Sequence, residues 1–199
     1  SYPGSGGVVT NSNGGVSSDF VVVSSAAGDF SGRISGNLNL FKTGQSTLTL
    51  RDLSDYTGTT SVLNNLLVLV DQGRLSNTSQ LTVRNAVLRW DDSGIQAMGN
   101  RLPSDLPVRL DGGAFEYVSR SGLNGAISIG GLDLPAGANL LRLNVGNGGA
   151  GTAQISVNSF SRSAGATLVF GAVAGAMGDN SYVKSDAFAA MPPLNGGLL

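Results

Sequence analysis

The chain lacks two residue types on which many active sites depend. Its 199 residues include no cysteine and no histidine. Without cysteine there are no disulfides and no thiolate metal ligands, and without histidine the commonest general base and metal ligand is missing. An ordinary serine triad is therefore excluded. We expect neither a cofactor nor an enzymatic activity.

Charged residues and long apolar runs are also scarce. Asp, Glu, Lys and Arg make up 13% of the chain, about half of the roughly 25% typical of soluble domains. The formal net charge is −1 and there is no basic block, so we do not expect a nucleic-acid partner. No apolar run approaches the roughly 20 residues that span a bilayer, so no membrane span is expected. The 41% of hydrophobic residues nevertheless predicts a packed core.

Short strand-like runs separated by turn residues fill the sequence. Apolar and polar residues alternate strictly in many of them, for example in residues 47–50 and 166–170, which is typical of strands with one buried face. Turn residues interrupt the runs about every 8–12 residues, as in all-β proteins. Helical periodicity is nearly absent. The sequence therefore predicts an all-β fold.

One pattern occurs twice, in residues 62–73 and again in residues 83–94. A period in the low twenties predicts a solenoid in which each repeat is one coil. A third copy, residues 110–117, follows the second after 27 residues, so we expect a right-handed parallel β-helix with about 21–27 residues per coil. A pair of Gly, Asn or Ala residues recurs within each copy and should turn the chain, because Gly and Asn accept positive φ. The extra residues, 100–107, are expected to bulge from one corner.

The solenoid is predicted to occupy residues 1–170. From residue 171 the alternation loosens into Gly-rich and Pro-containing sequence. We expect residues 171–199 to form a looser coil, a cap or the start of a further repeat.

Residues 38–50 and 56–62 resemble the autotransporter-associated β-strand repeat. The repeat runs roughly L-x-K-x-G-x-G-x-L-x-L, then Y-T-G-x-T-x-V, a Gly pair and L-x-V. Ser46 and the pair Asn64-Asn65 depart from it, each standing where Gly is usual. The resemblance implies a large bacterial surface or secreted protein built as a right-handed parallel β-helix, and no catalytic residue is transferred from the family. The residues that fit are Lys42, Gly44, Leu48, Leu50, Tyr56, Thr57, Gly58, Thr60, Val62, Leu67 and Leu69.

Asp71 and Asp92 occupy equivalent positions of consecutive coils, and Asp91 lies beside them. Equivalent residues of stacked strands lie about 5 Å apart, a spacing close to that of the two carboxylates in retaining glycosidases. Three interpretations are open: a turn residue at each strand end, a cation site, or a catalytic pair. We favour the turn, because Asp commonly ends strands in this way.

Exposed aromatic side chains would be needed to bind glycans, and Tyr56, Tyr117 and Tyr182 are the candidates. Trp90 replaces an inward Leu of the repeat and is expected in the core. The function predicted overall is structural: a stalk, fibre or filament subunit outside the cell or on a bacterial surface. Its expected partners are further copies joined head to tail, neighbouring repeats of a longer chain, or surface glycans. An adhesin or carbohydrate-binding module is the alternative, and a polysaccharide-active β-helix enzyme is a third.

Overall fold

Parallel strands stacked coil upon coil make up the protein. The computed structural model describes residues 6–146, 151–173 and 181–184. All strand pairs in these ranges are parallel, and the fold is a β-solenoid, which confirms the predicted all-β solenoid. In this described part of the chain no helix is long and apolar enough to cross a membrane.

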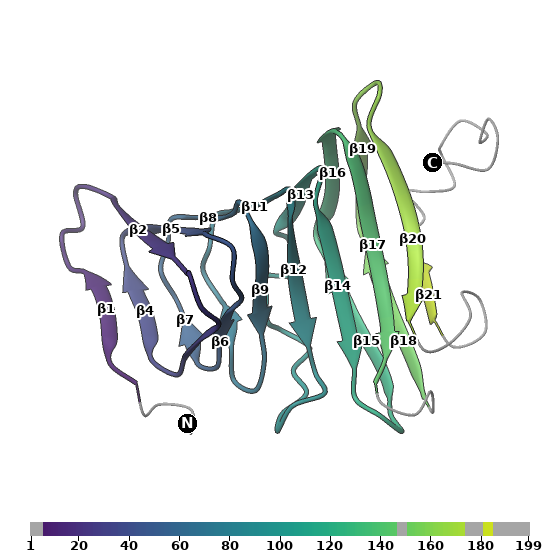
Figure 1. Ribbon diagram of the computed structural model, residues 1–199, viewed down its shortest axis with the longest axis horizontal. Helices are drawn as coiled ribbons and strands as arrows, with labels where there is room; N and C mark the ends of the chain where they lie inside the picture. The colour runs from purple at the N-terminus through teal and green to yellow at the C-terminus, as the bar shows by residue number, and fades with distance from the viewer. Residues whose placement is uncertain (1–5, 147–150, 174–180, 185–199) are drawn as a thin grey trace.

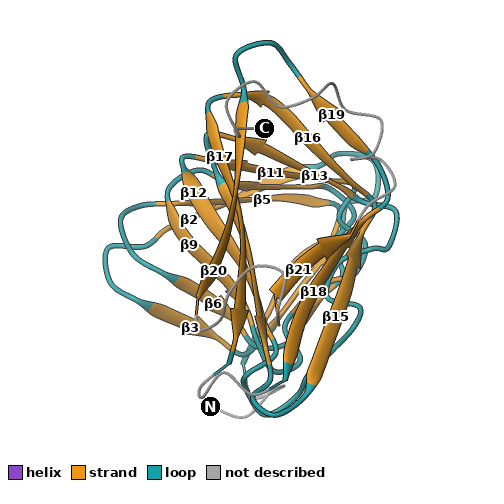
Figure 2. Cartoon of the chain, turned by 90° about the vertical axis from the view of Figure 1, so that its right-hand side faces the viewer, coloured by secondary structure: helices purple, strands orange, loops and turns teal. Residues whose placement is uncertain are grey.

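Each coil passes over three faces, and Figure 2 shows these faces as the sides of a triangle. Sheets B and C each contain seven strands and form two faces along the whole stack. Sheet B consists of β2 (Ser18–Val23), β5 (Leu38–Thr43), β8 (Thr59–Val62), β11 (Gln80–Arg84), β13 (Pro107–Asp111), β16 (Gly131–Ala136) and β19 (Phe160–Arg162). Sheet C consists of β3 (Gly28–Phe30), β6 (Leu48–Leu50), β9 (Asn65–Leu69), β12 (Ala86–Asp91), β14 (Ala114–Ser119), β17 (Ala138–Val145) and β20 (Thr167–Val173).

The third face is divided between two shorter sheets. Sheet A covers the early coils and sheet D the late ones, and no strand of one pairs with a strand of the other in the described chain. Sheet A consists of β1 (Val8–Asn11), β4 (Arg33–Gly36), β7 (Leu53–Ser54) and β10 (Arg74–Leu75). Sheet D consists of β15 (Asn124–Ile129), β18 (Thr152–Val157) and β21 (Ser181–Lys184).

The strand register confirms both repeat spacings read from the sequence. Leu69 pairs with Trp90, 21 positions later, and Trp90 pairs with Tyr117, 27 positions later. The full range of coil lengths is wider than expected. Leu48 pairs with Leu67 in the shorter coils, whereas Ala138 pairs with Thr167 near the other end. The strands of sheet C are longer in the late coils than in the early ones, and the solenoid widens toward its C-terminal end (Figure 1).

Inward side chains form continuous apolar columns inside sheet C. Alternate residues of each strand point to opposite faces, so the inward position of one strand stacks on the inward position of the next. Each fully buried Leu contributes about 1.5–3 kcal/mol, which explains why strict alternation specifies this fold. One such column contains Leu48, Leu67, Leu88, Phe115 and Leu141, and the next contains Leu50, Leu69, Trp90, Tyr117 and Leu143.

The chain turns from sheet B to sheet C through residues with positive φ. Asn65, Asn85 and Gly112 have φ values of 55°, 48° and 64°. All three belong to the Gly, Asn or Ala pairs expected to turn the chain, so that prediction is confirmed. In the same place along their coils, Gly44, Gly137 and Gly165 also have positive φ.

Lys42 is fully buried in β5 and turns its ammonium group toward the same corner. Its Nζ donates to the carbonyls of Thr43, Gly44 and Asn64, at 3.2, 3.4 and 3.0 Å. An ammonium group has three donors, so all three have acceptors although no carboxylate is among them. Burial lowers the pKa of Lys42. The lysine thereby connects two neighbouring coils at the turn.

The extra residues of the long repeat do not bulge as expected. Residues 93–100 are mostly exposed, whereas residues 101–106, here called the junction segment, return to the third face. The Leu75 amide donates to the carbonyl of Arg101 at 2.7 Å, and the Gly130 amide donates to the carbonyl of Leu106 at 3.2 Å. Leu102 and Leu106 are buried. The junction segment therefore fills the third face between sheet A and sheet D.

Strands are present on both sides of residue 170, where the alternation of the sequence loosens. That position lies inside β20 (Thr167–Val173), and β21 (Ser181–Lys184) pairs with β18. Residues 174–180 and 185–199 of the expected tail lie outside the described residues.

Candidate functional site

The predicted carboxylates meet at the junction between sheets A and D, where Arg101 occupies the centre. The Arg101 side chain is fully buried, and its Nε donates to Oδ1 of Asp92 at 3.0 Å. Its other four N–H groups donate to backbone carbonyls, so all five donors of the guanidinium have acceptors. Burial lowers the pKa of Arg101, and the charge of Asp92 opposes this shift. The carbonyls are those of Asp71, Gly73, Asp91 and Gln96, at 2.7–3.0 Å.

Asp92 is the acceptor around which this cluster is organised. Its side chain is 6% exposed, and Oδ1 also accepts from Trp90 Nε1 at 3.2 Å and from the Met98 amide at 3.1 Å. The hydroxyl of Tyr117 donates to Oδ2 at 3.4 Å. The Trp90 and Tyr117 rings pack edge to face, with centroids 6.4 Å apart. Trp90 is 1% exposed, so its expected place in the core is confirmed.

Asp71 is buried as well, but it binds different groups from Asp92. Its Oδ1 accepts from the Ile95 amide at 2.7 Å, and its Oδ2 accepts from Arg51 at 2.6 Å. Its φ is +57°, so Asp71 turns the chain at the end of a strand. The same Arg51 also pairs with Asp29, so one guanidinium joins residues of three successive coils.

Asp91 is half-buried and caps a turn. Its Oδ1 accepts from the amide and the hydroxyl of Ser93, at 2.9 and 2.6 Å. The described residues contain no group of three or more acidic side chains that could hold a metal ion. Asp71 and Asp92 are only 3% and 4% exposed and accept from protein donors, so they do not face a bound polysaccharide as a catalytic pair must. The geometry supports the turn interpretation for Asp71 and Asp91, whereas Asp92 is the acceptor of the buried Arg101 cluster.

The glycan candidates are placed differently from the expectation. Tyr56 is 0% exposed, and its hydroxyl lies 2.5 Å from Oγ1 of Thr60. Tyr117 is 1% exposed. Neither of these two candidates therefore presents the exposed aromatic face that a glycan would need. The Tyr182 side chain lies outside the described residues.

A small pocket of about 190 Å³ opens beside Asp92 and Tyr117. Met98, Leu123 and Gly125 are among the residues that line it. Gly125 is required here, because a Cβ at this position would lie 2.3 Å from the Tyr117 hydroxyl. Burial raises the pKa of Tyr117, and the nearby charge of Asp92 raises it further. The hydroxyl therefore stays protonated and serves as a hydrogen-bond donor.

Comparison with known proteins gives this chain no relative. No family model, no curated protein and no solved structure matches it. The site must therefore be interpreted from its own geometry.

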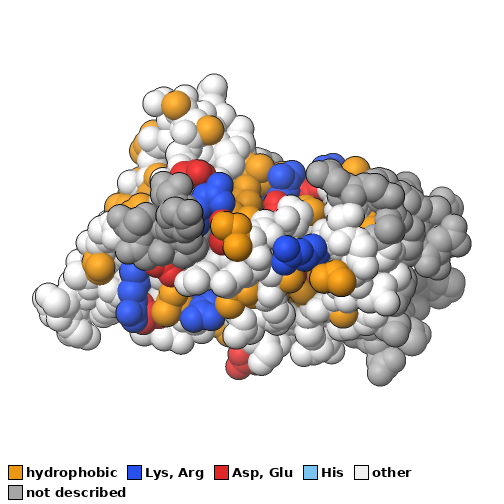
Figure 3. Space-filling model, turned by 90° about the horizontal axis from the view of Figure 1, so that it is seen from below, with side chains coloured by type: hydrophobic (Ala, Val, Ile, Leu, Met, Phe, Trp, Pro, Cys, Tyr) orange, Lys and Arg blue, Asp and Glu red, His pale blue; other side chains and the backbone are white. Residues whose placement is uncertain are grey.

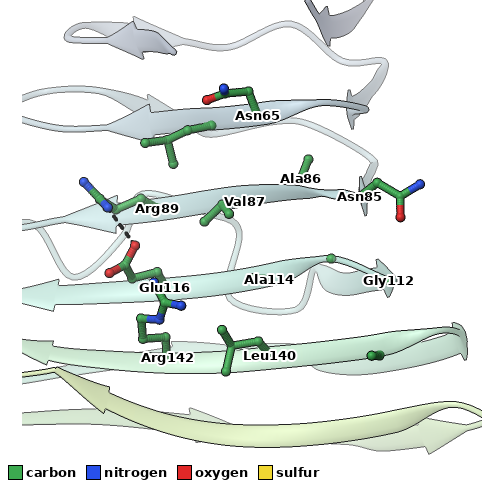
Figure 4. A pocket seen from close by; sticks show the side chains of 13 residues that line it. Asn65, Asn85, Ala86, Val87, Arg89, Gly112, Ala114, Glu116, Leu140 and Arg142 are labelled. Carbon is green, nitrogen blue, oxygen red and sulfur yellow. Dashed lines mark hydrogen bonds and ion pairs between the residues drawn. The ribbon is translucent and has the colours of Figure 1, made fainter. Parts of the chain in front are cut away.

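A larger hollow, here called the outer groove, lies on the outward face of sheet C. It measures about 550 Å³ and crosses β9, β12, β14 and β17 (Figure 4). Its apolar part is formed by outward residues of neighbouring strands, namely Leu66, Val87, Ala114 and Leu140. Ala114 is small, and its larger neighbours above and below leave a depression over it.

A row of three charged residues closes one side of the outer groove. Arg89, Glu116 and Arg142 are register partners in β12, β14 and β17. Arg89 Nε donates to Oε2 of Glu116 at 2.9 Å, and the Glu116 side chain is 4% exposed. Arg142 makes no ion pair within the described chain. One carboxylate therefore stands between two guanidinium groups, and the row has a net charge of +1.

Sequence reasoning missed Arg101 and the charged row for different reasons. Arg101 lies in a segment without periodicity, so no pattern indicated that it would be buried. The row was accessible in principle, because the 27-residue offset that aligns Trp90 with Tyr117 also aligns Arg89 with Glu116. The same alignment places Tyr117 in the column of the buried Trp90.

Proposed function

We propose that this chain is a structural segment of an extracellular β-solenoid rod, such as a stalk or fibre of a bacterial surface or secreted protein. The observation that carries the proposal is the environment of Arg101, whose five donors all bind groups of its own chain. Its charge joins successive coils instead of facing a substrate. The location outside the cell rests on the resemblance of residues 38–62 to the autotransporter-associated repeat. The proposal assigns the chain no catalytic role.

Ion pairs on the outside of the solenoid follow the same principle. Six of the seven ion pairs of the described chain join side chains in neighbouring coils. The four pairs in which both side chains are accessible contribute only about 0–1 kcal/mol each, whereas Asp71 and Glu116 are 4% exposed in the other two. Each pair joins two coils in a fixed register. Figure 3 shows basic and acidic side chains next to one another among much uncharged surface. The pairs are Arg33–Asp55, Arg51–Asp29, Arg51–Asp71, Arg84–Asp111, Arg89–Glu116 and Arg109–Asp133.

The exposed edge of β2, the first strand of sheet B, supports association at the narrow end of the solenoid. The amides of Ser18 and Ser24 donate to the next coil, so the amides of the alternate residues, including Val21 and Val23, point to the opposite edge. No described strand pairs with that edge. Val21 and Val23 are 53% and 70% exposed. An apolar edge of this kind accepts another strand, and we propose that the partner is a further β-solenoid coil.

Negative-stain imaging of the concentrated protein tests this proposal. We expect wild-type rods longer than a single unit, because coils add at the free edge. Val21→Pro removes the amide N–H that points to the free edge, and it leaves the hydrogen bonds between β2 and β5 in place. This variant should therefore form only single units. Val21→Thr is the control and should behave as the wild type. Monodisperse single units in all three samples would overturn the proposal, as would release of reducing ends from polysaccharides by the wild type.

A further inference from the structure

The outer groove has the features of a binding site with one charged end. It extends four residues along β17 from Ala138 to Arg142, which is about 13 Å. Across the strands it extends from β9 to β17, about 14 Å at the usual strand spacing. It is therefore long enough for a small linear molecule.

The lining of the outer groove selects the body of such a molecule. The apolar residues are all aliphatic, and no aromatic ring lines the groove; they are Leu66, Ala86, Val87, Ala114, Ala138 and Leu140. A sugar ring would find no stacking partner. The backbone donors and acceptors of β12, β14 and β17 are used in the parallel ladder of sheet C, so an extended peptide cannot add as a strand here. A flexible aliphatic chain needs neither an aromatic ring nor a free strand edge.

The charged row selects the head group. Glu116 forms an ion pair with Arg89, and this pair largely compensates the negative charge of Glu116 without a contribution from Arg142. Arg142 is half-buried and has no ion-pair partner in the described chain, which leaves its planar donor fork free. A guanidinium fork matches a carboxylate with two parallel hydrogen bonds. A single negative charge would also neutralise the row.

From these observations we propose that the outer groove binds an aliphatic carboxylate. The carboxylate is held by Arg142, and the hydrocarbon chain lies over Leu140, Ala114 and Val87 (Figure 4). This site lies on the side of the rod, away from the coil edges at its ends. It is therefore independent of the structural role proposed above.

A titration of the whole chain with hexanoate, followed by amide chemical shifts, tests the proposal. Hexanol has the chain without the charge, and acetate has the charge without the chain. We expect saturable shifts in β14 and β17 with hexanoate and at least roughly tenfold weaker binding of the other two, because a charged hydrogen bond and the apolar contact each contribute. Equal binding of hexanoate and hexanol would overturn the role of Arg142. Equal binding of hexanoate and acetate would reduce the site to nonspecific anion binding.

Matched variants separate the groove from the overall charge. Arg142→Gln should weaken hexanoate binding roughly tenfold or more. Arg84→Gln makes the same charge change on sheet B and should bind as the wild type. Ala114→Leu fills the apolar part and should weaken hexanoate without strengthening acetate. Unchanged hexanoate binding by Arg142→Gln, with amide spectra that show a folded protein, would refute the assignment.

Discussion

Replacement of Arg101 by Met should be the most damaging single change at the junction between sheets A and D. Met fills much of the same space but removes all five hydrogen bonds made by the guanidinium. Asp92 then keeps its charge in a buried position, with only Trp90 Nε1 and the Met98 amide as strong donors. Removing one partner of a buried ion pair costs about 3–5 kcal/mol, and the remaining donors place this case near the lower limit.

The carbonyls that Arg101 leaves behind add to the cost. Those of Asp71 and Gly73 lie in buried hydrogen bonds, and each costs about 1 kcal/mol when its donor is removed. Those of Asp91 and Gln96 are partly accessible, so water replaces the guanidinium there. We therefore expect Arg101→Met to lower the free energy of unfolding by about 5 kcal/mol. For a chain of this size that corresponds to a fall in Tm of about 10–20 °C.

Urea unfolding followed by circular dichroism measures this loss. Arg84→Met is the matched control, because Arg84 is 57% exposed in its ion pair with Asp111 and should cost less than about 1 kcal/mol. Adding Asp92→Asn to Arg101→Met removes the stranded charge and keeps an acceptor for Trp90, so the double variant should be more stable than Arg101→Met alone. A loss no larger than that of Arg84→Met would refute the reasoning.

Two further predictions concern the tyrosines and the corners. Burial raises the pKa of Tyr56 and of Tyr117, whereas both titrate near 10 in the unfolded chain. Above about pH 10 the unfolded state therefore loses protons that the folded state keeps, and stability should fall by up to about 1.4 kcal/mol per pH unit for each tyrosine. Urea unfolding between pH 9 and 12 should show that the free energy of unfolding falls less steeply with pH for Tyr56→Phe than for the wild type. The same dependence on pH in both proteins would contradict this prediction. At Asn85, with φ +48°, Ala should cost about 1 kcal/mol or more and Gly much less; equal urea midpoints for the two variants would show that the backbone conformation does not determine stability there.

The sequence carried most of the information about the coils. The corner at Asn85 follows a local rule, because only Gly and Asn commonly accept positive φ. The columns follow from the 21- and 27-residue offsets, because stacked coils repeat the same inward positions. The two offsets also indicate that coils differ in length, although not that lengthening continues toward the C-terminal end.

The candidate site was predictable only in part. Arg101 contacts the Asp92 carboxylate and the carbonyls of Asp71 and Asp91, and it comes from a segment without periodicity. Arg101 reaches Asp92 only because the junction segment folds back onto the third face, which depends on tertiary packing. Tyr117 was considered as a glycan-binding residue because glycan binding requires exposed aromatic side chains, although its alignment with Trp90 already indicated a core position.

The division of the third face between sheets A and D also bears on how the chain folds. In a solenoid each coil contacts only its neighbours, so structure can spread from coil to coil in either direction. Sheets B and C offer an uninterrupted template for that spreading, but on the third face the pairing stops after β10 and resumes at β15. Growth from either end must pass the junction segment, which is held by two backbone hydrogen bonds, by the buried Leu102 and Leu106 and by the Arg101 guanidinium, and not by a strand. Sheets B and C and the shared apolar core therefore couple the coils on the two sides directly, whereas on the third face that coupling passes through the junction segment and the hydrogen bonds of Arg101.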